Sequence, residues 1–202
     1  MDTITPKPAK LKQGTYLTLM RVRIYSGGVF PLALLILGRW NPLVFALGVV
    51  FIALGEALRL YSAGVLRKNE ELSRNGPYAL CRNPLYLGTI LIQLGFGLLS
   101  GSLVLALITL AWFIFIYTWV ILLEERWLAS LFGAQYRDYL RTTPRLLPTF
   151  GSLAAMGEGV HHSWKQAKVN HELKSAAISV IGTLLFLIKY IFALWSLPLN
   201  LW

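Results

Sequence analysis

The side chains best suited to chemistry gather in residues 75–88, which read NGPYALCRNPLYLG. Pro84 is placed to begin a helix, and the first turn of a helix has unpaired N–H groups that favour a carboxylate or a phosphate. Arg82 adds a permanent positive charge and a planar fork of donors beside that turn. This stretch therefore predicts a binding site for an anionic group.

Two further pairs of ionisable residues lie at the ends of apolar segments. Glu56 and Arg59 are three residues apart, so they share one face of a helix. An ionisable residue at membrane depth is a functional candidate, and a structural ion pair is an equally good interpretation. Glu124 and Glu125 follow a 22-residue uncharged segment, where the end of a helix disfavours anions. We expect a cation to compensate them, the alternative being an ordinary solvated pair.

The composition predicts that these residues are positioned by membrane helices. Of the 202 residues, 56% are hydrophobic and 14% charged, which excludes a disordered chain, a disulfide-stapled secreted module and a soluble dehydrogenase of the usual size. Five apolar segments can be membrane helices, because backbone groups in lipid must be satisfied within a segment. They are Ile24–Gly38, Leu43–Tyr61, Pro84–Leu99, Ser102–Leu123 and Ser175–Trp202. We expect an all-α polytopic transmembrane bundle of about five spans.

We interpret residues 1–202 as a single membrane domain. A basic cytoplasmic arm (1–23) precedes four transmembrane helices (24–123), and the final span occupies 175–202. Between them, segment 124–150 carries apolar residues at helical spacing, which predicts an amphipathic helix in the membrane interface. A basic cytoplasmic stretch follows at 151–174.

The basic residues predict the orientation of the chain. Lys and Arg number 19 against 9 Asp and Glu, and five spans place all of the 19 except Arg39 and Lys189 on one side. Because cytoplasmic loops are rich in Lys and Arg, we expect an inner-membrane protein with its N-terminus inside and its C-terminus outside. This bias explains the charge of +10 without a nucleic-acid partner.

Several motifs resemble the isoprenylcysteine carboxyl methyltransferase and phospholipid methyltransferase superfamily. The likeness covers Leu54 to Pro148 and includes Glu56 and Arg59. Its motifs, in chain order, are Gly76-Pro77-Tyr78, Arg82-Asn83-Pro84-Leu85-Tyr86-Leu87-Gly88, Glu124-Glu125-Arg126, Phe132-Gly133, Tyr136, Tyr139, Pro144-Arg145 and Pro148. Asn83 departs from the pattern, which more commonly has His there, so a role that needs a titratable imidazole is lost.

The resemblance implies an integral-membrane enzyme that uses S-adenosylmethionine. Arg82, Glu56 and Arg59 are the implied catalytic residues. The implied cofactor-binding residues are Tyr78, Arg82, Asn83, Pro84, Tyr86, Leu87, Gly88, Glu124 and Glu125. The two glutamates are expected to face the ammonium or the ribose, Arg82 a carboxylate, and Tyr78, Tyr86 and Leu87 the adenosine.

The leading hypothesis is methyl transfer to a lipophilic acceptor at the membrane surface, with membrane lipids around the protein. The alternatives are an NADPH-dependent reductase of isoprenoid or sterol-like lipids and a non-enzymatic membrane scaffold. The sequence identifies neither the acceptor nor the oligomeric state.

A few remaining residues have weaker interpretations. His161, His162 and His171 favour a solvated basic stretch over a metal site, since no second spaced pair of ligands is present. Cys81 beside Arg82 is a minor candidate for a thiolate nucleophile. Lys189 interrupts the last span and is free to pair with Glu56, to snorkel, or to face another protomer.

Overall fold

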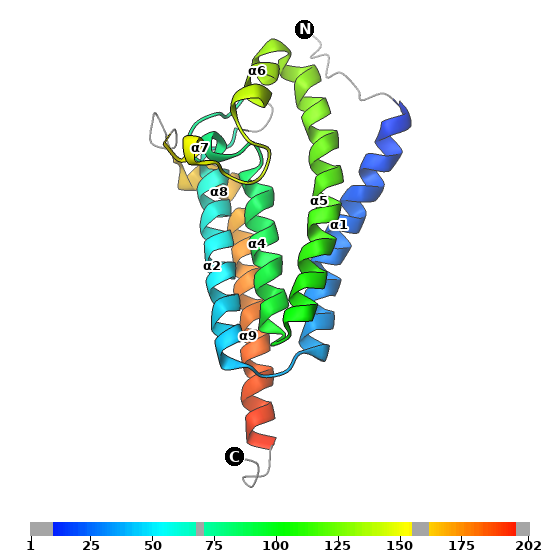
Figure 1. Cartoon of the computed structure of the whole chain (residues 1–202), viewed down its shortest axis with the longest axis vertical. Coiled ribbons are helices and arrows are strands. Elements are labelled where there is room, and N and C mark those ends of the chain that lie inside the picture. The colour runs from blue at the N-terminus through cyan, green and yellow to red at the C-terminus, as the bar shows by residue number, and fades with distance from the viewer. Residues whose placement is uncertain (1–9, 68–70, 155–161, 197–202) are drawn as a thin grey trace.

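A computed structural model describes residues 10–67, 71–154 and 162–196 of the chain (Figure 1). These residues form helices joined by turns, with no strand among them. In chain order the helices are α1 (Lys10–Leu37), α2 (Pro42–Val65), α3 (Pro77–Leu80), α4 (Pro84–Leu99), α5 (Leu103–Phe132), α6 (Ala134–Thr142), α7 (Phe150–Ala154), α8 (Trp164–Val169) and α9 (Glu172–Ser196). We call the end of the bundle where α3, α6, α7 and α8 lie the motif end; it is at the top of Figure 1.

The expected all-helical polytopic bundle is confirmed. Four segments of the described helices are long and apolar enough to cross a membrane: Leu17–Leu37, Pro42–Val65, Leu103–Phe132 and Glu172–Phe192. The fifth long helix, α4, has only 16 residues. It contacts α1, α2, α5 and α9, so most of its surface is covered by other helices rather than by lipid (Figure 1). The chain is an integral membrane protein.

Among the helix boundaries that differ from the expected ones, two bear on the site. α1 begins at Lys10, inside the segment expected to be a basic arm. α5 does not end before Glu124 but continues to Phe132, because no Gly or Pro interrupts it until Gly133, whose φ of 56° ends the helix. The prediction that Glu124 and Glu125 occupy the end of a helix is therefore wrong, and the helix dipole does not oppose their charge there.

Glycines allow α2 and α4 to pack backbone against backbone. A Cβ atom added at Gly55 lies 2.6 Å from the carbonyl oxygen of Gly88, and one at Gly48 lies 2.8 Å from that of Gly95. Small residues at such crossings let membrane helices approach closely. The close crossing brings the Arg59 stem alongside Gly88, near the start of α4.

At the end opposite the motif end, α9 holds the termini of other helices. Lys189 Nζ donates to the carbonyl oxygens of Leu35 and Gly38, each at 2.6 Å, where α1 ends. A cation is favourable at a helix C-terminus. Tyr190 donates to the carbonyl oxygen of Leu99 at 2.5 Å. Lys189 therefore stabilises the end of α1 and does not pair with Glu56.

The contact between α2 and α4 predicts that Gly55→Ala destabilises the protein. The added methyl group meets the backbone of Gly88, which cannot move without shifting α4, and overpacking of this kind costs about 1–3 kcal/mol. Thermal unfolding in detergent measures the effect, with Gly28→Ala as the control because a Cβ there meets nothing within 4 Å. Equal unfolding midpoints for the two variants contradict the prediction.

Candidate active site

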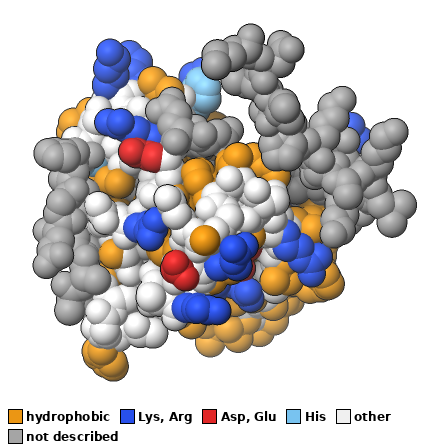
Figure 2. All heavy atoms as spheres, turned by 90° about the horizontal axis from the view of Figure 1, so that it is seen from above, with side chains coloured by type: hydrophobic (Ala, Val, Ile, Leu, Met, Phe, Trp, Pro, Cys, Tyr) orange, Lys and Arg blue, Asp and Glu red, His pale blue; other side chains and the backbone are white. Residues whose placement is uncertain are grey.

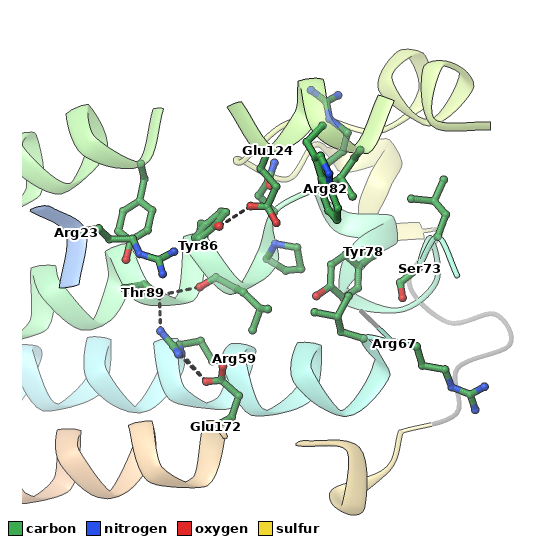
Figure 3. A pocket seen from close by; sticks show the side chains of 18 of the residues that line it. Arg23, Arg59, Arg67, Ser73, Tyr78, Arg82, Tyr86, Thr89, Glu124 and Glu172 are labelled. Atoms are coloured by element: carbon green, nitrogen blue, oxygen red, sulfur yellow. Dashed lines mark hydrogen bonds and ion pairs between the residues drawn. The ribbon is translucent and has the colours of Figure 1, made fainter. Parts of the chain in front are cut away.

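A pocket of about 640 Å³ opens at the motif end of the bundle (Figure 3). Its walls come from α1, α2, α4, α5, α6 and α9 and from the segment between α2 and α4. This volume lies within the range of small-molecule and cofactor sites, which is about 300–1,000 Å³.

The pocket brings together most of the residues that the sequence predicts for the site. Seven of them line it: Arg59, Tyr78, Arg82, Asn83, Pro84, Tyr86 and Glu124. The other four lie outside its lining: Glu56, Leu87, Gly88 and Glu125. The two groups have different environments.

Glu124 is the carboxylate on the α5 wall of the pocket. Tyr86 of α4 donates its phenolic hydrogen to Glu124 Oε2 at 2.5 Å (Figure 3). The guanidinium carbon of Arg23 lies 5.9 Å from the centroid of the Tyr86 ring, within the range of a cation–π contact. Glu124, Tyr86 and Arg23 thus place a negative and a positive group on one side of the pocket.

Arg59 and Glu172 form the opposite wall. Arg59 donates to Glu172 Oε2 from Nη2 at 2.6 Å and from Nε at 3.0 Å, and Nη1 donates to Thr89 Oγ1 at 2.5 Å (Figure 3). Glu172 lies in the first turn of α9, where the helix dipole favours an anion. This ion pair fixes α9 against α2 and α4 beside the pocket.

Glu125, next to Glu124, points away from the pocket into a buried ion cluster. Its Oε1 accepts from Arg82 Nε at 2.9 Å and Nη2 at 2.8 Å, and its Oε2 accepts from Arg145 Nη2 at 3.0 Å and Nε at 3.1 Å. The Arg82 and Glu125 side chains are each 8% exposed. The cation expected beside the paired glutamates is therefore present, at Glu125.

Arg82 also holds the end of α6 and the chain that follows it. Its Nη1 donates to the carbonyl oxygens of Leu140 at 3.0 Å and Thr143 at 2.5 Å. Asn83 Nδ2 donates to the carbonyl oxygen of Arg145 at 3.0 Å. Arg82 and Asn83 thus connect the turn before α4 to the segment 140–145, while both residues still contribute to the pocket wall.

The short helix α3 contributes a buried polar atom to the pocket. The hydroxyl oxygen of Tyr78 is buried and has no hydrogen-bond partner among the described residues. Burial raises the pKa of Tyr78, so this hydroxyl remains protonated at neutral pH. Tyr139 of α6 fixes α3 by donating to the carbonyl oxygen of Tyr78.

Cys81 does not have the environment of a nucleophile. Its side chain is 1% exposed, and burial raises the pKa of the thiol to about 11. At neutral pH the thiol is therefore protonated, whereas a nucleophilic cysteine needs a lowered pKa and access to its substrate.

Glu56 and Gly88 belong to the packing behind the pocket, and Leu87 is a half-buried residue of α4 outside the pocket lining. Ser179 of α9 donates to Glu56 Oε1 at 2.7 Å, and Glu56 Oε2 is buried without a partner in the described part of the chain. Gly88 makes room for Gly55 and Arg59 of α2. Glu56 and Gly88 thus join α9 and α4 to α2.

The histidines do not form a metal site in the described chain. His162 stacks on Tyr61 with ring centroids 5.7 Å apart, and His171 occupies the turn before α9 with a φ of 63°. His161 lies outside the described residues. No group of three or more His, Cys, Asp or Glu side chains placed to hold a metal ion is found in residues 10–67, 71–154 and 162–196.

Sequence reasoning missed several polar residues of the pocket, among them Arg23, Gln93 and Glu172. Gln93 is a polar residue inside an apolar segment, and Glu172 is an acid immediately before the last apolar segment. A polar residue inside an apolar segment and an acid directly before one are both unusual in membrane helices. Their positions in the sequence could therefore have identified Gln93 and Glu172 as candidates. Arg23 was read as part of a basic arm, because the sequence did not reveal that α1 extends through it.

The ion cluster predicts that Arg82→Lys destabilises the protein. Lysine keeps the charge but cannot donate to Glu125 and to two backbone carbonyl groups in the same planar arrangement. Each hydrogen bond that the charged group loses costs about 1.5–3 kcal/mol, so we expect a fall in the thermal unfolding midpoint. Arg126→Lys is the control, because Arg126 follows Glu125 on α5 but is exposed and lies outside the ion cluster and the pocket. An unfolding midpoint like that of the wild type shows that Arg82 does not support the fold.

The model of the family described as "Phospholipid methyltransferase" matches residues 26–135. The cobalt-zinc-cadmium resistance protein CzcN of Cupriavidus metallidurans is 36% identical over 160 residues, which are 73% of this chain and 74% of that protein. The nickel-cobalt-cadmium resistance protein NccN of Alcaligenes xylosoxydans xylosoxydans is 37% identical over 103 residues, 50% of this chain and 47% of that protein. No solved structure matches significantly.

The matched region contains α2, α4 and α5, most of the residues that line the pocket, and the motifs from Tyr78 to Glu125. It excludes Arg23 of α1 and Glu172 of α9. The match covers more than half of the chain, and the relative CzcN extends the similarity over nearly three quarters of it. The chain belongs to the phospholipid methyltransferase family.

Proposed function

We propose that this protein transfers a methyl group from S-adenosylmethionine to a lipophilic acceptor at the cytoplasmic surface of the membrane. The observation that carries the proposal is the pocket at the motif end, because residues of this chain whose motifs resemble those of methyltransferases line it. Tyr78, Asn83, Tyr86 and Glu124 are among the motif residues that line this pocket.

The pocket fits the chemistry of S-adenosylmethionine. That molecule carries a sulfonium, an ammonium, a carboxylate and an adenosine, so it requires acidic and cationic groups beside aromatic walls. The lining supplies carboxylates at Glu124 and Glu172, guanidinium groups at Arg59 and Arg67, and the buried unpartnered hydroxyl of Tyr78. A buried polar atom without a partner in the protein is a position where a ligand can supply one.

Within this proposal, the residues act by binding and orienting rather than by covalent chemistry. The bound cofactor supplies an activated methyl group on a sulfonium, whose transfer mainly requires in-line positioning of the acceptor. Glu124 is placed to attract a positive charge, and its hydrogen bond from Tyr86 fixes its rotamer. The first turn of α4, beginning at Pro84, favours a carboxylate.

We assign Arg82 and Glu125 a positioning role. Their mutual hydrogen bonds and those of Arg82 to Leu140 and Thr143 use most of the donors of the guanidinium group. Arg82 therefore supports the wall formed by Tyr78, Asn83 and Pro84, and Glu124 is the member of the paired glutamates that faces a ligand.

The proposed location is the cytoplasmic side of the inner membrane. Lys and Arg side chains are spread over the motif end, which Figure 2 shows from above. Because cytoplasmic loops are enriched in these residues, we propose that the motif end faces the cytoplasm and that the pocket is reached by a soluble cofactor from there.

The two relatives are named as metal resistance proteins, so the proposal for this pocket also concerns metal ions. Its carboxylates already have partners: Arg59 binds Glu172, Tyr86 binds Glu124, and Arg67 Nε lies 3.5 Å from Glu71 Oε1. We propose that this chain contributes to any such resistance through a methylated product and not by holding a metal ion in the pocket.

The proposal predicts that purified protein binds S-adenosylmethionine and that Glu124→Gln weakens this binding. Loss of an interaction with a charged group costs about 1.5–3 kcal/mol, which is a factor of about 10 to 150 in the dissociation constant. Isothermal titration calorimetry in detergent measures it. Asp138→Asn is the control, since Asp138 is an exposed carboxylate of α6 outside the pocket.

The same titration with NADPH tests the reductase alternative. Binding of NADPH with no binding of S-adenosylmethionine contradicts the proposal and favours a reductase. Binding of neither cofactor by protein with a normal unfolding transition favours the scaffold. Equal affinities of the wild type and Glu124→Gln for S-adenosylmethionine remove Glu124 from the cofactor site.

A further inference from the structure

The short helix α8 packs against the end of α2 and is bonded to it at both of its own ends (Figure 1). At the start of α8, the backbone N–H of Ser163 donates to the carbonyl oxygen of Gly64 at 3.0 Å. At its end, Asn170 Nδ2 donates to the carbonyl oxygens of Ala63 at 2.8 Å and Leu66 at 3.0 Å. The last carbonyl groups of a helix need partners from outside it, and α8 supplies them here. α8 is therefore fixed at the level where α2 ends.

This level is the boundary of two membrane spans. The spanning segment of α2 is Pro42–Val65, and that of α9 begins at Glu172, two residues after Asn170. α8 thus lies beside the end of one span and directly before the start of another. No residue of α8 lines the pocket, and α8 lies beyond the residues that match the family. Its exposed surface is therefore separate from the proposed cofactor site.

That surface carries large apolar side chains. Ala167 is fully buried on the side of α8 that packs against the bundle, whereas Trp164 is 65% exposed and Val169 is 61% exposed. Leu173, at the start of α9, is also exposed. Apolar side chains at the end of a span are accommodated in the headgroup layer, where tryptophan is enriched. The exposed side of α8 is thus suited to a lipid surface.

Aromatic contacts hold Trp164 in place on this surface. The ring of His162 stacks on Tyr61 of α2 with centroids 5.7 Å apart, and the ring of Trp164 packs edge-on against His162 with centroids 4.8 Å apart. Trp164 is therefore fixed against the end of α2 although most of its surface is exposed.

The exposed charges beside these apolar residues are positive. Lys165 and Lys168 of α8 and Lys174 of α9 are all exposed. Glu172 is the sole acid between residues 162 and 196, and it is buried and paired with Arg59. A helix that combines exposed apolar and basic side chains binds anionic lipid surfaces, to which each lysine contributes.

We propose that α8 is an interfacial helix that binds the anionic phospholipid headgroups of the membrane surface. Trp164 and Val169 enter the headgroup layer, while Lys165 and Lys168 extend to the lipid phosphate groups, as long basic side chains do at an interface. The hydrogen bonds from Ser163 and Asn170 then fix the end of α2 at the level of the lipid phosphates. The proposal concerns lipid alone and does not depend on the proposed function.

Lipid-dependent quenching of a fluorophore on α8 tests the proposed depth. Val169→Cys in a Cys81→Ser background carries an NBD fluorophore and leaves Trp164 and the lysines in place. The full chain is reconstituted in dioleoyl phosphatidylcholine vesicles that contain dioleoyl phosphatidylglycerol. Arg137→Cys in the same background is the control, because Arg137 is exposed on α6, which lies farther out along the bundle than α8 (Figure 1).

The two label positions are expected to respond in opposite ways. Lipids with a doxyl group near the headgroup quench the label at position 169 more strongly than the label at position 137, and aqueous iodide quenches it less. Doxyl quenching at position 169 no stronger than at position 137 overturns the proposal. Strong iodide quenching there, without doxyl quenching, shows that α8 faces water and also overturns it.

The lysines are tested by the lipid preference at the same label. Quenching by spin-labelled phosphatidylglycerol is compared with quenching by spin-labelled phosphatidylcholine, which gives the relative affinity of α8 for the anionic lipid. We expect this preference to fall about fivefold for each lysine removed, in Lys165→Gln and in Lys168→Gln, as for the loss of one surface charge. Both lysines are exposed, so the fold is retained, and the unfolding midpoint in detergent checks it.

The double variant Arg137→Gln, Arg141→Gln is the matched control for charge. Both arginines are exposed on α6 at the same end of the bundle and lie outside the pocket. Their removal tests general attraction between basic residues and anionic lipid, and we expect no change in the preference at position 169. An unchanged preference in the double variant Lys165→Gln, Lys168→Gln, or an equal fall in the arginine variant, overturns the proposal.

The binding of S-adenosylmethionine to the same preparations separates this proposal from the proposed function. Because no residue of α8 lines the pocket, we expect the lysine variants to bind the cofactor as the wild type does. Loss of cofactor binding in the wild type removes the methyltransferase proposal and leaves the lipid contact of α8 standing.

Discussion

The buried carboxylate of Glu125, held between Arg82 and Arg145, is the interaction on which the motif end depends. It joins α5 to the turn before α4 and to the segment after α6, three parts that are far apart in the sequence. A buried charge of this kind is tolerated only when its partners satisfy it fully, as the two guanidinium groups do here. The ion cluster therefore fixes where α4 begins, and with it the positions of Asn83 and Tyr86 in the pocket.

A second constraint comes from the glycines between α2 and α4. Their close crossing places Arg59 beside Thr89, and the ion pair of Arg59 with Glu172 then fixes the start of α9. The pocket thus lies between two ion pairs. Arg82 and Glu125 form the pair on the side of Glu124, and Arg59 and Glu172 form the pair on the other side. Arg23 differs from both, because it has no ion-pair partner in the described chain.

The sequence predicted the helical membrane architecture and seven of the residues that line the pocket, because apolar segment length and local motifs are visible along the chain. It could not predict the roles of Glu124 and Glu125, which are adjacent in sequence but face opposite environments. Helical rotation separates them by about 100°, and only the partners supplied by distant segments decide which one is buried. Glu172 and Arg59 are 113 residues apart, so their pairing depends on tertiary structure. The length of α5 was misjudged because a change in amphipathic pattern does not end a helix; Gly133 does.

The central claim is that the pocket at the motif end holds S-adenosylmethionine. Ultraviolet crosslinking of methyl-radiolabelled S-adenosylmethionine to the purified full chain, followed by peptide mapping, tests it most directly. The account predicts label on peptides that contain Tyr78, Tyr86 or Glu124, and loss of the label when excess S-adenosylhomocysteine competes. Label confined to peptides outside the pocket, such as that of α8, or label that resists competition, contradicts the account.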